Sequence, residues 1–447
     1  MKALVSFFSR LYFTRYFFYA LSAAVGLFVL AFFFPAFLFL VKILFGVLVL
    51  FVLVDVAALF RHPEGIAASR SMQEKLSNGS ENPVYLYVEN RYGFTVRLEV
   101  MEELPFQFQK RDASFLVQVP PGETHVIEYQ LRPVQRGVYS FGATNVFVNG
   151  PLQLVRRRYQ FGRGQEVPVY PSFLQLRQYE LLAASQHLTA MGIKKVRKVG
   201  HSAEFEQIRS YVAGDDQRTI NWKASARKAE LMVNHYQDEK SQQVYCLIDK
   251  GRVMEMPFAG LSLLDYAINA TLVLSNVALR KEDKAGLITF SDQIGSVLPA
   301  ERRASQLQKI LELLYSQTTK FQETDFQRLY VTVRSKVKQR SLLLLFTNFE
   351  TLNGAKRQLP YLRKLAKHHL VLVIFFENTE TRALLEKPAD STEEIYLKAI
   401  AEKFAYEKRQ IVKEFAAHGI HSVLTPPDKL TVNTINKYLE FKSRGLL

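Results

Sequence analysis

The segment EFEQIRSYVAGDDQRTINWKASARKAELMV, residues 204–233, holds the only tryptophan of this 447-residue chain, Trp222, among many charged and amide side chains. The apolar residues at its start are spaced i, i+3, i+7, as in an amphipathic helix: Phe205, Ile208 and Val212. We expect a short helix here that Gly214 ends. Asp215 and Asp216 then stand where a second short helix, through Trp222, would take a capping carboxylate.

Arginine and aspartate side chains around one large aromatic ring are typical of a planar, bidentate hydrogen-bonded junction. Three roles are open for such a segment: a structural lock between two soluble domains, a surface that faces a partner, or acid–base catalysis by Asp215 or Asp216. Adjacent carboxylates point in different directions, and Arg218 and Arg227 would keep both of them ionised. The structural lock is therefore the preferred interpretation.

The segment resembles the signature of the domain of unknown function 58 family, E-F-x-x-I/L-R-x-Y-x-x-G-D-D-x-R-x-I-N-W-x-A-S-A-R. The signature residues singled out here are Glu204, Arg209, Tyr211, Gly214, Asp215, Asp216, Arg218, Asn221, Trp222, Ser225 and Arg227. The resemblance extends over most of the soluble chain. It implies association with a MoxR-type AAA+ ATPase, in a chaperone-like or envelope-assembly role.

A long apolar run near the N-terminus predicts a membrane anchor. From Tyr16 to Phe60 the only charged residues are Lys42 and Asp55, and a spanning helix needs about 20 apolar residues. We expect a helical hairpin within residues 1–62, with helices at 16–34 and 37–60 and a reversal at Pro35. A cleaved signal peptide is the alternative, but the run is too long and no small-residue cleavage site follows it.

Basic residues flank the outer ends of this hairpin: Lys2, Arg10, Arg15, Arg61 and Arg70. By the positive-inside rule both termini and the soluble domains are expected in the cytoplasm, on a multi-pass protein of the inner membrane. The single cysteine, Cys246, agrees with a reducing compartment, and it lies in an apolar strand pattern that favours a core position.

The formal net charge of +16 has three possible causes. A basic face would complement an anionic inner leaflet, and this is the simplest account for a tethered protein. The chain lacks the motifs that usually accompany nucleic-acid binding, so nucleic acid is a weaker alternative. An acidic protein partner is the third. Basic clusters lie at Arg156–Arg158 and at residues 194–198.

The chain beyond the hairpin is predicted to hold two domains. Residues 70–175 alternate apolar and polar side chains between turn formers, as in a small immunoglobulin-like β-sandwich, with strands at 84–90, 96–104, 114–119, 124–133 and 144–150. The E-E-L-P run at Glu102–Pro105 and the R-G-V-Y-S-F-G run at Arg136–Gly142 resemble the family's β region. Where that family usually has P-L-G-L, this chain has Pro151-Leu152-Gln153-Leu154, so the turn there is expected to differ.

Residues 176–242 are read as the signature linker, and residues 243–447 as a doubly wound α/β domain. Continuous apolar runs predict buried parallel strands at 244–249, 285–290, 341–346, 370–376 and 421–425. Helices are expected between and after them, near 261–281, 304–316, 326–338, 354–367, 393–418 and 429–441. The order of elements, with Gly286–Asp292, resembles a von Willebrand A-type domain.

That resemblance implies a divalent cation at the carboxyl ends of the strands, held by oxygen ligands. Asp249 stands where the first ligand is expected, and Thr324 aligns with the later threonine. Gly251 and Val253 replace both hydroxyl ligands of the first loop, and Asn348 replaces a carboxylate. We therefore predict a degenerate site with no metal, in which Asp249 pairs with Lys250 or Arg252 or caps a helix; a working magnesium site is the alternative.

The chain is predicted not to be an enzyme, since it holds no nucleophile-elbow, zincin, Walker A or dinucleotide motif. No catalytic residue, cofactor or small-molecule substrate is expected. The preferred function is a membrane-anchored scaffold or adaptor whose partners are the lipid bilayer and the MoxR-type ATPase. Two alternatives remain: a membrane-surface hydrolase that uses Asp215 or Asp216, and an adaptor that binds anionic lipid or nucleic acid.

Overall fold

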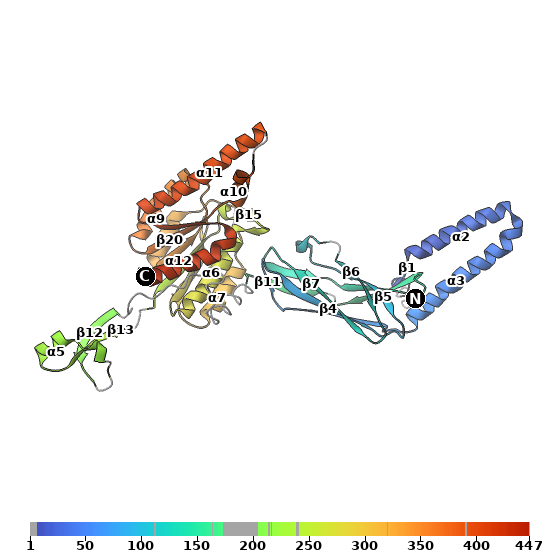
Figure 1. The fold of residues 1–447 in the computed structure, drawn as a ribbon, viewed down its shortest axis with the longest axis horizontal. Coiled ribbons are helices and arrows are strands. Elements are labelled where there is room, and N and C mark those ends of the chain that lie inside the picture. The colour runs from blue at the N-terminus through green and yellow to red at the C-terminus, as the bar shows by residue number, and fades with distance from the viewer. Residues whose placement is uncertain are drawn as a thin grey trace. The chain divides into compact units, whose positions relative to one another are not determined.

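The computed structural model describes residues 7–110, 113–162, 164–172, 204–212, 215, 217–237, 241–319, 321–388 and 391–446. The chain divides into two compact units, Met1–Tyr170 and Pro171–Leu447 (Figure 1). The signature residues Gly214 and Asp216 lie outside the described residues, and of Glu204 and Arg218 only the backbone is described.

The first unit opens with an apolar helical hairpin. Helix α2 (Arg15–Phe33) and helix α3 (Leu38–Phe60) are joined by the 3-10 turn η1 (Pro35–Phe37) and lie side by side (Figure 1). The predicted pair of helices and the reversal at Pro35 are confirmed. Both helices are long and apolar enough to cross a membrane, and most of their side chains are exposed.

The first unit also contains two sheets that pack face to face. A five-stranded sheet has the order β1-β10-β9-β5-β6, and a three-stranded sheet has the order β2-β4-β7. Their strands are β1 (Leu11–Phe13), β2 (Ile66–Met72), β4 (Asn82–Asn90), β5 (Val96–Glu102), β6 (Ser114–Val119), β7 (Thr124–Leu131), β9 (Thr144–Asn149) and β10 (Val155–Phe161). Alternate apolar residues of both sheets, such as Leu86 and Val148, form one buried core, so this part of the chain is a β-sandwich.

A third sheet with the order β3-β11-β8 closes one end of the sandwich. It is formed by β3 (Leu76–Ser77), β8 (Gly137–Phe141) and β11 (Gln165–Tyr170). The five strands predicted in this region are confirmed as β4, β5, β6, β7 and β9. The sequence analysis did not predict β1 or β10; three consecutive arginines, Arg156–Arg158, hide the apolar alternation of β10.

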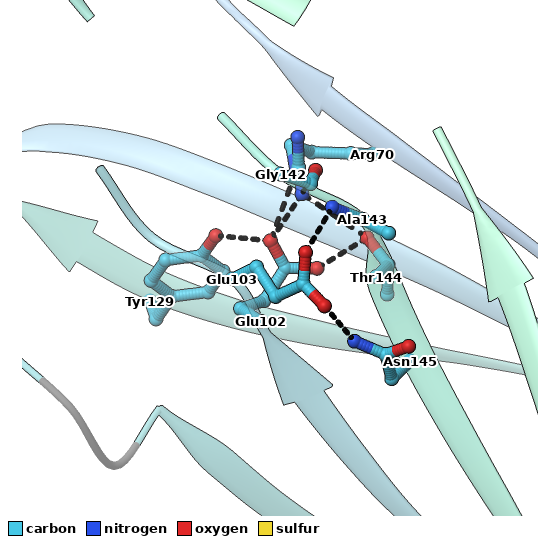
Figure 2. A network of polar contacts seen from close by, with 8 residues as sticks. All are labelled: Arg70, Glu102, Glu103, Tyr129, Gly142, Ala143, Thr144 and Asn145. Atoms are coloured by element: carbon cyan, nitrogen blue, oxygen red, sulfur yellow. Dashed lines mark hydrogen bonds and ion pairs between the residues drawn. The ribbon is translucent and has the colours of Figure 1, made fainter. Parts of the chain in front are cut away.

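A buried ion pair joins the two sheets of the sandwich (Figure 2). Arg70 of β2 donates from Nε to Glu102 of β5 at 2.9 Å, and both side chains are almost fully buried. Thr144 and Tyr129 also donate to Glu102. Burial raises the pKa of the Glu102 carboxyl, while Arg70 acts in the opposite direction.

The neighbouring Glu103 completes this network. Its carboxylate accepts from the Ala143 amide at 3.0 Å and from Asn145 at 2.8 Å (Figure 2). A Cβ atom at Gly142 would lie only 2.6 Å from the Glu103 Cβ atom, so only glycine fits there. The two runs that resemble the family's β region, Glu102–Pro105 and Arg136–Gly142, therefore contact each other inside the sandwich.

The second unit contains a six-stranded sheet with the order β18-β17-β14-β19-β20-β21. Strands β14 (Gln243–Asp249), β17 (Lys284–Phe290), β19 (Leu342–Phe346), β20 (Leu370–Phe376) and β21 (His421–Thr425) are parallel, and β18 (Ile294–Glu301) is an antiparallel edge. The predicted parallel strands are confirmed. Strand β18 was not predicted, because its residues are only partly buried.

Helices cover both faces of this sheet, as predicted. Helices α6 (Leu263–Arg280), α7 (Gln306–Tyr315) and α12 (Leu430–Ser443) pack on one face. Helices α8 (Phe326–Lys336), α9 (Leu352–Ala366) and α11 (Thr392–Ala417) pack on the other. Helix α10 (Thr379–Glu386) is an addition that the sequence analysis did not predict. Cys246 lies in the first core as predicted, and burial raises the pKa of its thiol to about 12.

We expect Arg70→Ala to destabilise the sandwich by roughly 3–5 kcal/mol, because it strands the Glu102 carboxylate in the core. The loss should be smaller near pH 5 than near pH 8. Without Arg70, burial keeps the pKa of Glu102 raised, so the folded protein holds this carboxyl in its protonated form at low pH. The folded state then loses stability as the pH rises through that pKa. Urea-gradient pulse proteolysis of the full-length protein in detergent measures both effects. Arg91→Ala, which removes an exposed ion pair with Glu89, is the matched control. Equal midpoints for the two variants would contradict the role of the buried pair.

Candidate functional site

A buried carboxylate fastens the apolar hairpin to the sandwich. Asp55 lies one turn before the end of α3 and is 0% exposed. Its Oδ1 atom accepts from the Leu152 amide at 2.8 Å, and its Oδ2 atom accepts from the amides of Leu154 at 2.8 Å and Val155 at 3.3 Å. A carboxylate held by several backbone amides is a charge-assisted contact of the stronger kind.

The loop that donates to Asp55 has a matching shape. A Cβ atom at Gly150 would lie 2.5 Å from the Asp55 carboxyl carbon, so only glycine allows the close approach. Gln153 adopts the left-handed conformation with φ of 60°. Residues other than glycine rarely adopt this conformation. This is the position where the family usually has glycine. Gln153 thus adopts the left-handed conformation without being glycine, and the expected difference from the family's turn stays a prediction.

Arg157 closes the carboxyl end of α3. Its guanidinium donates to the carbonyl oxygens of Leu59 at 2.6 Å, His62 at 2.7 Å and Pro63 at 2.9 Å. Leu59 lies in the last turn of α3, where carbonyls have no partner within the helix, and His62 and Pro63 follow that turn. A cation at this end also complements the helix dipole. The same guanidinium lies over the rings of Phe60 and Tyr159.

The other arginines of the Arg156–Arg158 cluster are also engaged. Arg156 forms an ion pair with Glu99 at 2.6 Å, and Arg158 donates to the Asn145 side-chain oxygen at 2.8 Å. Arg157 is buried. The expectation that this cluster forms a basic surface for anionic lipid or nucleic acid is therefore wrong for Arg157, which serves the helix end.

The first leg of the hairpin is fixed to the same loop. Strand β1, just before α2, pairs antiparallel with β10, with Leu11 opposite Arg157. Thr14 caps α2 and donates from its hydroxyl to the Gln153 carbonyl at 2.5 Å. Both legs of the hairpin are thus held by residues 152–157. The sequence signal for this junction was Asp55 itself, because an ionisable residue inside an apolar helix indicates a functional position; Thr14 and Arg157 carried no such signal.

The carboxyl ends of the central strands form a second polar site. Asp249 ends β14 and is 0% exposed. Its Oδ1 atom accepts from Thr324 at 2.6 Å and from the Gly251 amide at 2.8 Å, and its Oδ2 atom accepts from Thr347 at 2.7 Å. Burial raises the pKa of this carboxyl and the three donors counteract it. Hydroxyls and an amide hold Asp249, where the sequence analysis predicted Lys250 or Arg252.

Asn348 at the end of β19 is held by a lysine from α11. Lys408 donates from Nζ to the Asn348 Oδ1 atom at 2.9 Å and to the Phe376 carbonyl oxygen at 2.5 Å. Burial lowers the pKa of Lys408 to about 8, against the pull of Glu350 and Glu377. The sequence analysis missed Lys408, which lies 60 residues from Asn348 with no motif around it.

These residues do not fit a divalent cation. Gly251 and Val253 offer no side-chain oxygen, and the Asn348 oxygen already accepts from an ammonium group. A Cβ atom at Gly251 would lie 2.1 Å from the Thr324 hydroxyl, so that hydroxyl fills the space of a side chain at position 251. Within the described residues, no group of three or more His, Cys, Asp or Glu side chains is placed to hold a metal ion.

The signature segment folds as a small hairpin with one helix. Strand β12 (Glu204–Ser210) pairs antiparallel with β13 (Met232–Gln237), and η4 (Gln217–Thr219) and α5 (Trp222–Lys228) lie between them in sequence. The helix predicted from Phe205 to Val212 is therefore wrong. The pairing has a bulge between Phe205 and Gln207. An extra residue in a strand lets positions three apart share a face, which imitates helical spacing.

Small polar side chains of the signature build this hairpin. Asn221, and not Asp215 or Asp216 as predicted, caps α5: its side chain accepts from the Ala224 amide at 3.0 Å and donates to Asn234 at 2.8 Å. The Ser225 hydroxyl accepts from the Met232 amide at 2.8 Å. Asp215 forms an ion pair with Arg209 at 2.6 Å and accepts from the Val212 amide.

The large side chains of the signature face outward. Trp222 is 70% exposed, and Arg227 is exposed as well. Tyr211 is half-buried and uses its backbone amide to bind Leu231. The predicted buried junction around Trp222 is therefore wrong. The contacts of Asp215 with Arg209 and with the Val212 amide are typical of a structural turn.

Comparison with known proteins agrees with the signature. Residues 207–386 match the family described as "Protein of unknown function DUF58". This region of the chain belongs to the DUF58 family. The matched region runs from the signature hairpin through the first part of the α/β sheet, and it includes the Asp249 site. The description of the DUF58 family names no activity.

Individual relatives of this DUF58 protein are distant. The uncharacterized protein YeaD of Bacillus subtilis (strain 168) is 28% identical over 124 residues, which are 28% of this chain and 31% of YeaD. The match thus spans less than a third of that relative. BatB from Bacteroides thetaiotaomicron is 15% identical with a TM-score of 0.30, covering 46% of this chain and 100% of BatB.

A further solved structure resembles part of the chain. The CARDB domain of PF1109 from Pyrococcus furiosus is 17% identical with a TM-score of 0.18, covering 23% of this chain and 86% of that domain. At these TM-scores neither likeness carries an argument about this DUF58 protein. The site is therefore interpreted from its own contacts.

We expect Asp55→Asn to loosen the junction, because an amide cannot accept from all the backbone donors that the carboxylate holds. Loss of a hydrogen bond to a charged group costs roughly 1.5–3 kcal/mol, so peptides that cover residues 150–158 should exchange amide hydrogens at least about tenfold faster. Hydrogen-exchange mass spectrometry of the full-length protein measures this. Lys42→Gln, at the other charged position of α3, is the control. Unchanged exchange in Asp55→Asn would refute the junction.

We expect magnesium ions to leave the melting temperature of the protein unchanged, because Asn348 and Asp249 are already engaged by protein donors. The combined change Val253→Ser, Asn348→Asp and Lys408→Gln restores two oxygen ligands and removes the ammonium group, while Gly251 is kept because a side chain there would clash with Thr324. It should make melting depend on magnesium, and adding Asp249→Ala should remove that dependence. A magnesium-dependent rise in the natural protein that Asp249→Ala abolishes would show that the site binds metal.

Proposed function

We propose that this protein is a membrane-anchored scaffold. In this proposal the α2–α3 hairpin crosses the inner membrane twice, and both termini and the soluble units face the cytoplasm. The observation that carries the proposal is the junction at Asp55, where both legs of the hairpin are bonded to the sandwich. A signal sequence or a loosely tethered anchor has no need of such a junction, whereas a scaffold must hold its domains at a fixed position above the bilayer.

The basic flanks of the hairpin support the proposed orientation. Arg10, Arg15 and Arg61 lie at its open end, where β1 and the sandwich begin, and no charged residue lies in η1. Positive residues near helix ends remain on the cytoplasmic side. The sandwich would then stand on the cytoplasmic surface, next to the ends of the helices.

We further propose that the α/β domain is von Willebrand A-like and acts without a metal ion. The strand order and the position of Asp249 at the carboxyl end of β14 support the likeness. In an open α/β sheet, ligands bind where the strand order reverses, and here β14 lies between β17 and β19 at that point. A site closed by hydroxyls and Lys408 suits a binding domain better than an enzyme.

The partner we propose is a MoxR-type AAA+ ATPase, as the family resemblance implies. Trp222 and Arg227 support a docking role for the signature hairpin, because exposed tryptophan and arginine residues are enriched in the residues that dominate protein–protein binding energy. The polar residues Asn221 and Ser225 hold the hairpin in shape, so the outward side chains are free to serve a partner.

The test is a pull-down of the detergent-solubilised full-length protein, with and without ATP. We expect a MoxR-type ATPase to co-purify with the natural protein, and Trp222→Ala to abolish this without lowering the melting temperature. Phe321→Ala, at an equally exposed aromatic residue of the α/β unit, is the matched control and should retain the ATPase. Absence of the ATPase from the natural protein's eluate in both conditions would refute the partner. A lowered melting temperature in Trp222→Ala would restore the structural-lock hypothesis.

A further inference from the structure

Helix α11 has two halves with different surroundings. Its carboxyl-terminal half places Ile411 and Phe415 in the core of the α/β unit. Its amino-terminal half extends past the rest of that unit, beside α10 (Figure 1). Large apolar side chains on this half are exposed: Ile395, Tyr396, Leu397, Ile400 and Phe404. A helix that is apolar without a core to face usually belongs to an interface.

Part of this surface forms a stripe that leads into a pocket. Leu397, Ile400 and Phe404 are spaced i, i+3, i+7 and therefore lie along one side of the helix. Phe404 also lines a pocket of about 330 Å³ whose other walls include Met256 and Phe258. The stripe meets the pocket at Phe404, and the stripe and pocket together are called the α11 groove below.

The α11 groove is acidic, unlike the chain as a whole. Glu350, Glu377 and Glu380 line the pocket together with a single cation, Lys408, among the described residues. The three glutamates and one lysine give this lining a net charge of −2, whereas the whole chain carries +16. Complementary charge selects partners and speeds their encounter.

The charge decides between the classes of occupant. An anionic bilayer attracts basic surfaces, so it would be repelled by this one. A symmetric dimer through the groove would bring two acidic surfaces together. A basic helix with one apolar face complements both the apolar stripe and the acidic charge of the groove. Its apolar side chains can enter the pocket while its cations face the glutamates.

We propose that the α11 groove is a docking site for a basic amphipathic helix of a partner protein. The apolar stripe binds the apolar face of that helix, and the pocket receives one large side chain from it. Glu377 and Glu380 interact with its basic residues. This site is separate in sequence from the signature hairpin, and its existence does not depend on the identity of the proposed ATPase.

The probe is a synthetic helical peptide of about 18 residues, with leucines on one face and lysines on the other. The full-length protein is placed in phosphatidylcholine nanodiscs, and peptide binding is measured by fluorescence anisotropy with empty nanodiscs subtracted. We expect saturable binding that weakens at least about tenfold in the combined variant Leu397→Ser, Ile400→Ser, Phe404→Ser. Val331→Ser, at an exposed apolar residue of α8, is the matched control and should bind normally.

Charge is tested with two further measurements. A peptide in which glutamates replace the lysines should bind at least about tenfold more weakly, and Glu377→Gln with Glu380→Gln should weaken binding of the lysine peptide. Circular dichroism of each variant establishes that the fold is kept. Equal binding of both peptides, or equal binding by the triple serine variant, would overturn the proposal.

The other occupants predict different results. If the serine variant changes the mass of the particle from two copies to one, the groove is a self-interface and the proposal is wrong. If the nanodisc-embedded protein binds phosphatidylserine vesicles through Leu397, Ile400 and Phe404, the groove is a membrane contact and the proposal is equally wrong.

Discussion

The contact between the Asp55 carboxylate and the amides of Leu152, Leu154 and Val155 fixes the apolar hairpin of this protein to the sandwich. Carboxylates are costly to bury, and they are tolerated when several donors replace the lost water. Here the donors belong to a loop of the sandwich, so the hydrogen bonds that compensate burial of the Asp55 charge also attach α3 to the sandwich. Gly150 and the left-handed Gln153 shape the loop around it, and Arg157 binds the carbonyls that the same helix end exposes.

Inside the sandwich, the buried ion pair between Arg70 and Glu102 has a different structural role. Arg70 and Glu102 lie on opposite sheets and are nearly fully buried, and each finds further partners. A buried ion pair stabilises little compared with apolar packing, but a shift of register between the sheets would leave both charges unpaired. The pair therefore specifies how the two sheets align, while the apolar core supplies most of the stability.

At the carboxyl ends of the α/β strands, protein groups occupy the places where a cation's ligands and charge would be expected. Thr324 and Thr347 bind the Asp249 carboxylate, and the ammonium group of Lys408 lies on Asn348. Protein donors thus engage both the Asp249 carboxylate and the Asn348 side-chain oxygen. The α11 groove shares Asn348 and Lys408 with this region, which places the proposed docking site next to the point where the strand order reverses.

The order of elements could be predicted from local patterns. Apolar runs gave the hairpin and the parallel strands, and alternation gave five strands of the sandwich, because burial on one or two faces leaves a periodic trace in any sequence. The signature also identified the family, whereas the degenerate cation site inferred from Gly251, Val253 and Asn348 stays a prediction.

Only the tertiary structure decided the contacts between residues that lie far apart in sequence. Asp55 meets Leu154, and Asn348 meets Lys408, across 99 and 60 positions, and no local pattern records such a pairing. The signature shows the same limit, since the spacing of Phe205 and Ile208 predicted a helix, whereas this segment forms a strand by pairing with residues 232–237. The sequence by itself determined which segments are apolar and how they alternate; long-range geometry decided which polar groups meet, because a hydrogen bond depends on position in space and not on spacing along the chain.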